Sequence, residues 1–167
     1  MALRLLLNPA AEQLEAIAEN IAKLRRCEDR SPFQAFQLAS ALISHVDKVL
    51  VGEGLQIMEA LAFQQWQVVT SDRRESTGSA GGKDRENMTM LGDCYFYVAV
   101  GHTKLNDLVK ARSSVERMLE LIPGHPQGVA LRQHIDDQLW RDGVLGLGGL
   151  AVAGLAGVLV AAALRRK

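Results

Sequence analysis

The chain has 167 residues, of which 48% are hydrophobic, 23% charged and 5% aromatic, and its 19 Lys and Arg residues balance 19 Asp and Glu. Because there is no net charge, nothing directs the protein toward nucleic acid. Two cysteines that lie far apart, Cys27 and Cys94, argue against a disulfide framework. The four histidines show no metal-ligand spacing, so no metal and no other cofactor is expected.

The amino-terminal part predicts two helices. The first begins at Asn8 as N-cap, with Pro9 at the first helical position, and continues to about residue 26. The apolar run before Asn8 is too short for a secretory signal, so we expect this domain in the cytosol. The second helix covers residues 31–45, where Ser31 and Gln34 form a capping-box pattern.

A third helix is predicted over residues 48–69, and the composition then changes. Residues 70–85 contain one Ala and no larger apolar residue, which predicts a solvated, mobile loop. Part of this loop, residues 77–84, is similar to a phosphate-binding loop only superficially. Thr77 replaces the first Gly and Asp84 replaces the Ser or Thr that would hold Mg²⁺. We therefore interpret the segment as a linker.

Three more helices are predicted after this loop: over 85–105, over 106–122 with Asn106 as its cap, and from residue 126 onward. Every residue from 143 to 164 is Gly, Ala, Val or Leu. As a helix this run would be roughly 33 Å long, enough to cross a bilayer. A membrane anchor is therefore predicted over residues 143–164, followed by the basic tail Arg165, Arg166 and Lys167.

Small residues recur every fourth position within this anchor. Such a stripe allows two helices to approach closely in lipid, which would make a homo-oligomer. The alternative is that small residues only keep the anchor moderately hydrophobic. The anchor positions singled out are Gly143, Gly149, Ala153, Gly157, Ala161 and Leu164.

The helices after residue 30 fit the tetratricopeptide pattern in two copies. In the second copy Tyr95 takes the large aromatic position, Ala111 the small position of the second helix and Pro123 the closing position. In the first copy Phe36 and Gly54 take corresponding positions. The predicted fold is all-α, a six-helix bundle with two tetratricopeptide-like helix pairs, followed by a single transmembrane helix.

This pattern divides the chain into a head and an anchor. The head is residues 1–142, with repeat one at about 31–69, repeat two at about 86–123 and a capping helix at 126–142.

The sequence shows no nucleophile elbow and no paired carboxylates in a convincing pocket. An enzyme is therefore not expected.

Four stretches resemble the mitochondrial fission 1 family, small tail-anchored adaptors of the outer membrane: residues 96–105, 110–112, 119–123 and 142–146. The resemblance extends over roughly residues 31–164, although the 70–85 loop is longer than the family's turn. It implies an adaptor that brings a dynamin-related GTPase, directly or through co-adaptors, to mitochondria and peroxisomes for fission. By the same resemblance, the head faces the cytosol from the mitochondrial outer membrane, and the peroxisomal membrane is a second expected location.

The family's proposed docking groove is the concave face made by the first helix of each repeat. Repeat geometry assigns this groove to Phe33, Phe36, Ser40, Ile43, Phe96, Val100, Thr103 and Lys104. Two readings stay open: the groove accepts a partner helix or extended segment, or the first helix lies over it and the phenylalanines are core. Both readings would hold in turn if an amino-terminal arm covers the groove until a partner displaces it. This arm contains Leu3, Leu5, Leu6 and Leu7.

A second function is kept as an alternative, namely an outer-membrane repeat receptor for chaperones or import precursors. Receptors that clamp the carboxylate of a chaperone tail need several Lys, Arg and Asn side chains on the concave face. Here Lys104 is nearly alone on that face, which disfavours this alternative.

Overall fold

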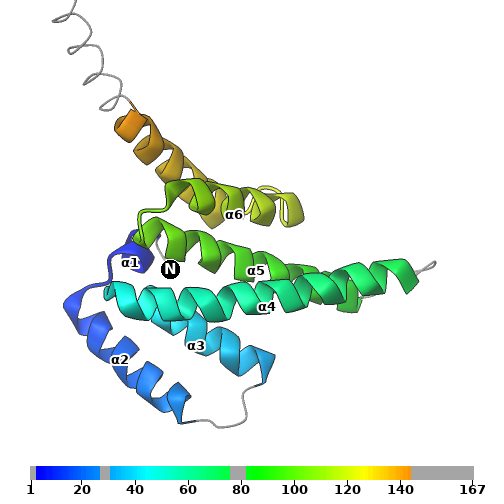
Figure 1. The fold of residues 1–167 in the computed structure, drawn as a ribbon, viewed down its shortest axis with the longest axis horizontal. Coiled ribbons are helices and arrows are strands. Elements are labelled where there is room, and N and C mark those ends of the chain that lie inside the picture. The colour runs from blue at the N-terminus through cyan, green and yellow to red at the C-terminus, as the bar shows by residue number, and fades with distance from the viewer. Residues whose placement is uncertain (1–2, 27–30, 76–81, 144–167) are drawn as a thin grey trace, which may run out of the picture.

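A computed structural model describes residues 3–26, 31–75 and 82–143, and these ranges contain helices and no strand. The helices are α1 (Leu3–Leu7), α2 (Ala11–Arg25), α3 (Pro32–Ser44), α4 (Lys48–Glu75), α5 (Gly82–Lys104) and α6 (Leu108–Leu121). A further helix covers residues 126–143. Figure 1 shows them stacked in chain order from α2 to this last helix, with α1 beside the end of α5. The all-α prediction is confirmed.

The amino-terminal start differs from the expected one. Asn8 is not a helix N-cap, because its backbone N–H donates to the carbonyl oxygen of Arg4 at 2.9 Å and so closes α1. The N-cap of α2 is Ala10, whose N–H donates to Oε1 of Gln13 at 3.2 Å. The physical reason is that Leu6 is buried in the core, which stabilises a separate short helix. The described residues therefore hold one helix more than the six expected.

The capping box predicted for α3 is confirmed. The hydroxyl of Ser31 accepts from the N–H of Gln34 at 3.3 Å, and Oε1 of Gln34 accepts from the N–H of Ser31 at 3.1 Å. Pro32 occupies the first turn, where its missing N–H has no cost. The entry to α3 is thus fixed locally, which positions the phenylalanines that follow it.

The expected loop over residues 70–85 is helical at both of its ends, and residues 76–81 lie outside the described residues. Helix α4 continues to Glu75, and the hydroxyl groups in this part of it bond to carbonyls of the preceding turn. The hydroxyl of Thr70 donates to the carbonyl oxygen of Trp66 at 2.9 Å, and that of Ser71 to the carbonyl of Val68 at 2.9 Å. A polar composition alone therefore did not end the helix.

The N-cap of α6 lies one residue after the expected Asn106. Oδ1 of Asp107 accepts from the N–H of Lys110 at 3.3 Å, so Asp107 is the N-cap. Asn106 instead adopts a left-handed backbone with φ of 63° and helps to end α5. The N–H of Asp107 donates to the carbonyl of His102 at 2.9 Å, the bond expected after a left-handed helix terminus.

Two helix hairpins, α3–α4 and α5–α6, pack against each other through α4 and α5. Gly54 allows the first hairpin to close: a Cβ at this position would lie 2.7 Å from Cβ of Leu42 and 2.8 Å from the carbonyl oxygen of Ala39. The main core lies between the two hairpins and includes Met58, Leu91, Val115 and Ile135. A smaller core between α2 and α3 contains Ile21, Leu38, Ala41 and Leu42.

Among the described residues, none of the helices combines the length and the hydropathy that crossing a bilayer requires. Of the predicted anchor only Gly143 is described, at the end of the last helix. Gly149, Ala153, Gly157, Ala161, Leu164 and the tail Arg165–Arg166–Lys167 lie outside the described residues.

Candidate partner-binding groove

A hollow of about 790 Å³ opens between the start of α3 and the first turns of α5. We call it the aromatic groove. Its lining residues are Phe33, Phe36, Arg85, Glu86, Thr89, Met90 and Asp93. Phe33 is 63% exposed, so its ring is available to a partner, whereas Phe36 is half-buried. An exposed ring beside a methionine side chain suits an apolar side chain of another protein.

Ring contacts hold the buried side of this groove. Phe36 meets Tyr97 edge to face, with ring centroids 5.5 Å apart and an angle of 88° between the planes. Tyr97 meets Phe96 in the same manner at 5.6 Å, and Phe96 lies 6.3 Å from the ring of His125. This chain of rings connects α3 to the segment after α6, and it fixes Phe36 while Phe33 stays free to contact a partner.

The polar groups at the groove are of both signs. Arg85 and Glu86 are exposed, and Asp93 is half-buried. Burial raises the pKa of Asp93, and the nearby His125 opposes this shift. Burial, and then the Asp93 carboxylate, raise the pKa of the Tyr97 hydroxyl. The groove therefore combines an apolar floor with mixed polar edges, an arrangement suited to recognition of a peptide segment.

A second, smaller hollow of about 290 Å³ lies toward the other end of α5, and we call it the Lys104 hollow. Its lining residues come from the ends of several elements: Leu7, Asn8, Val46, Lys48, Val51, Thr103, Lys104, His134 and Gln138. The Oε1 atom of Gln138 is buried there and has no hydrogen-bond partner among the residues that the structure describes.

The ammonium of Lys104 terminates α3. It donates to the backbone carbonyl oxygens of Ile43, Ser44 and His45, each at 2.9 Å. These carbonyls have no partner within the helix, and a cation there also matches the helix dipole. Burial lowers the pKa of Lys104 to about 8, so the ammonium remains the main species at pH 7.

The amino-terminal arm packs on α5, but neither the arm nor α2 contributes a residue to the aromatic groove. In α1, Leu6 is buried in the main core, and Leu3 and Leu7 pack against it. Helix α2 packs through Ile21 on the side of α3 that carries Leu38 and Leu42. The arm therefore borders the Lys104 hollow and leaves the aromatic groove open.

The eight residues assigned to the groove from sequence divide into two sets. Phe33 is exposed, and Phe36, Ser40 and Lys104 are partly exposed. The other four are buried: Ile43, Phe96, Val100 and Thr103. Phe33 and Phe36 meet in the aromatic groove, and Thr103 and Lys104 meet in the Lys104 hollow. Four of the expected groove residues therefore lie in two separate hollows, one between α3 and α5 and the other at the end of α5.

The groove predicted from the sequence includes α5 only from Phe96 onward, so it lacks the residues that the first turns of α5 contribute. Those turns directly follow the segment expected to be a mobile loop. The signal was present, because Glu86, Met90, Asp93 and Tyr97 follow one another at intervals of three or four residues. That spacing places them on one side of a helix.

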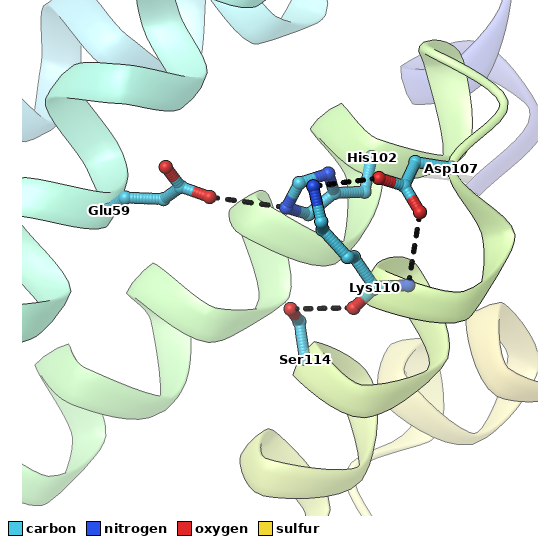
Figure 2. Close-up of polar contacts among 5 residues, drawn as sticks. All are labelled: Glu59, His102, Asp107, Lys110 and Ser114. Carbon is cyan, nitrogen blue, oxygen red and sulfur yellow. Dashed lines mark hydrogen bonds and ion pairs between the residues drawn. The ribbon is translucent and has the colours of Figure 1, made fainter.

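A third hollow of about 680 Å³ lies on the outer side, between α4 and α6 over α5. Figure 2 shows Glu59 and His102 pointing toward one another there; Nε2 of His102 is 3.2 Å from Oε1 of Glu59. Lys110 pairs with Asp107 at 3.0 Å, and the hydroxyl of Ser114 donates to the carbonyl of Lys110 at 2.9 Å. Because Ser114 is bonded within its own helix and not to His102, these contacts tie helices together and form no nucleophile–base pair.

No group of His, Cys, Asp and Glu able to hold a metal ion is present in the part of the chain that the structure describes. Cys94 is buried, and burial, followed by the nearby Asp93 charge, raises the pKa of its thiol to about 12. A thiol that stays protonated is inert as a nucleophile.

The comparisons with known proteins agree on one family. Residues 92–144 match the Fis1 C-terminal tetratricopeptide repeat. The mitochondrial fission 1 protein of Tuber borchii is 33% identical over 105 residues, which cover 60% of this chain and 68% of that protein. The FIS1-related protein fis-1 of Caenorhabditis elegans is 29% identical over 132 residues, 78% of each chain.

The solved structures agree in fold. The crystal structure of fission protein Fis1 from Saccharomyces cerevisiae superposes with a TM-score of 0.58 at 18% identity, over 88% of this chain and 97% of that one. Yeast Fis1 in complex with an Mdv1 fragment gives a TM-score of 0.52 at 17% identity, over 80% and 87%. The resemblance read from the sequence is confirmed: the chain belongs to the mitochondrial fission 1 family.

Proposed function

We propose that this protein is a membrane-anchored adaptor in organelle fission, which recruits a dynamin-related GTPase or its co-adaptors through the face formed by α3 and α5. The observation that carries the proposal is Phe33, a 63% exposed ring at the mouth of a groove whose other ring, Phe36, is fixed by Tyr97. Membership of the family supports the same role, since yeast Fis1 has been solved in complex with an Mdv1 fragment.

The anchor is part of this proposal. Residues 143–164 contain no charged or polar side chain, and Arg141 and Arg165 flank them. Such a segment would hold the head at the mitochondrial outer membrane, with the peroxisomal membrane as a second address. We propose in addition that the anchor self-associates through Gly149, Ala153, Gly157 and Ala161. Gly157→Ile is expected to weaken association in a membrane two-hybrid assay, and unchanged association would leave the small residues without that role.

Two phenylalanines allow a matched test of the groove. The full chain is reconstituted in liposomes and offered a dynamin-related GTPase, with and without co-adaptors from the same organism. Phe33→Asp is expected to abolish capture. Phe63→Asp is the control, because Phe63 is 59% exposed but lines the outer hollow. Capture that survives Phe33→Asp and fails with Phe63→Asp would move the docking surface to the other side of the bundle.

The alternative of a receptor that clamps chaperone carboxylates finds less support. The hydrogen-bond donors of Lys104 are already directed at three backbone carbonyls. A carboxylate would have to compete with the cap of α3 for them. We therefore retain the fission adaptor as the proposed function.

A further inference from the structure

Four of the exposed apolar side chains belong to segments that converge at one end of the bundle. Val46 is 51% exposed, Val49 77%, Val109 73% and Trp140 71%. A single exposed apolar residue is ordinary, but these four belong to three separate parts of the chain. We call this group the apolar end.

Contacts between the helices bring these parts together. Val46 follows His45, whose carbonyl oxygen accepts from Lys104 at the end of α5. Val109 is in the first turn of α6, which begins soon after α5 ends. The last helix runs back along α6, because Nε of Arg112 meets Oδ1 of Asp136 at 2.7 Å, and Trp140 is one turn farther on. Figure 1 shows the starts of α4 and α6 and the end of the last helix on the same side of the molecule.

The Lys104 hollow confirms this convergence independently of the picture. Val46, just before α4, and Lys48, its first residue, line it together with His134 and Gln138 from the last helix. Thus the start of α4 lies beside the part of the last helix that precedes residue 143.

The last described residue, 143, lies at the end of the last helix on this same side. After Trp140, Arg141 and Asp142, the sequence from 143 to 164 contains only Gly, Ala, Val and Leu. Trp and Arg are residues that concentrate at the boundary between lipid and water. A bilayer entered by residues 143–164 would therefore have its surface close to the apolar end.

Charge does not explain an affinity of this end for lipid. The basic residues Lys48, Lys110 and Arg141 are matched by the acidic residues Asp47, Asp107 and Asp142. The free energy of contact would come from burial of apolar side chains, and it would depend little on salt or on anionic lipid.

We infer that the apolar end of the head inserts Val46, Val49, Val109 and Trp140 into the interfacial layer of the bilayer. The head then lies against the membrane in one orientation. The inference rests on the proposed anchor, which delivers the head to the bilayer, and it adds a second contact that sets how α3 and α5 face the cytosol. An amphipathic surface of this kind buries its side chains at the boundary between headgroups and acyl chains.

The test places a single tryptophan at either of two positions on α4. The full chain carries Trp66→Phe and Trp140→Phe, together with Val49→Trp or, as the control, Val68→Trp. Val68 is also exposed and lies roughly 28 Å farther along the same helix at 1.5 Å per residue. Each variant is reconstituted in phosphatidylcholine liposomes with brominated acyl chains, which quench tryptophan within the bilayer. Val109→Trp in the same background serves as the second probe if Val49→Trp lowers helix content.

We expect the tryptophan at 49 to lose at least half of its emission and the one at 68 to keep it, in 0.1 M and in 0.5 M salt alike. A chain that floats with the liposomes but shows no quenching at 49 and 109 overturns the inference and leaves the proposed anchor intact. Equal quenching at 49 and 68 overturns it as well, because the head would then have no defined end at the membrane. A chain that does not float contradicts the anchor and the inference together.

Discussion

The ammonium of Lys104 on α5 donates a 2.9 Å hydrogen bond to the backbone carbonyl oxygen of His45, the C-cap residue of α3. This bond joins the first helices of the two repeats, which together line the aromatic groove, and α5 also lines the Lys104 hollow. The groove geometry therefore depends on a backbone cap that a side chain 59 residues away supplies.

Replacing Lys104 is expected to destabilise the head. Lys104→Met removes three charge-assisted donors and leaves partly buried carbonyls without them, which predicts a loss of about 2–3 kcal/mol in the free energy of unfolding. Urea unfolding of the full chain in detergent measures it. Lys110→Met is the control, since its exposed pair with Asp107 contributes about 0.5 kcal/mol. Equal losses in the two variants would contradict the capping role.

Two glycines on α4 make opposite predictions. Gly54→Ala would place a Cβ 2.8 Å from the carbonyl oxygen of Ala39, so the α3–α4 hairpin must shift and stability falls by about 1–3 kcal/mol. Gly52→Ala meets nothing within 4 Å, and the gain in helix propensity predicts about 0.5–1 kcal/mol of added stability. Thermal unfolding of both variants distinguishes them. A stabilised Gly54→Ala variant would show that the hairpin is not in close contact.

Cys94 predicts a loss of stability at alkaline pH. Its folded pKa of about 12 lies above the ordinary value of 9.0, so the folded state keeps a proton that the unfolded chain releases. Stability from this group is complete below pH 9 and is lost as the pH rises from about 9 toward 12. Between pH 8 and 10 the linkage amounts to about 1.4 kcal/mol.

The measurement is the difference in unfolding free energy between the native chain and Cys94→Ala at the two pH values. The contributions of the other titrating groups cancel in this difference. Between pH 8 and pH 10 the native chain should lose about 1.4 kcal/mol of unfolding free energy relative to Cys94→Ala. A constant difference would mean that the thiol is hydrated in the folded state.

The amino-terminal arm borders the Lys104 hollow, so it is expected to compete with a partner that extends from the aromatic groove into that hollow. Displacing α1 for such a partner requires exposure of Leu6, whose burial is worth about 1.5 kcal/mol, so deleting residues 1–8 should raise partner affinity about tenfold. Leu6→Ala should reproduce part of the gain, whereas Leu5→Ala should not, because Leu5 is 37% exposed. Titration calorimetry with a co-adaptor fragment measures the affinities. Unchanged affinity after the deletion would show that the arm does not compete with the partner.

The repeat pattern predicted the hairpins well because it records packing. Gly54 and Ala111 are small where two helices approach, and both lie at such contacts. The N-caps at Asn8 and Asn106 were wrong because Asn, Asp and Ser all compete for these positions, and tertiary contacts of the leucines in α1 selected a different start. The sequence could not predict which groove residues are buried either, since Phe33 and Phe96 look alike in a helical stripe but are 63% and 6% exposed.

In the proposed function, the apolar segment 143–164 directs the protein to its membrane, and the helical head provides the surface that a partner recognises. Imaging of three tagged forms, in cells that lack their own fission 1 protein, separates these roles: the full chain, the chain ending at residue 142, and Phe33→Asp. We predict that the full chain lies on mitochondria and restores their division, that the truncated chain is dispersed, and that Phe33→Asp lies on mitochondria without restoring division. A truncated chain that still lies on mitochondria would contradict the account.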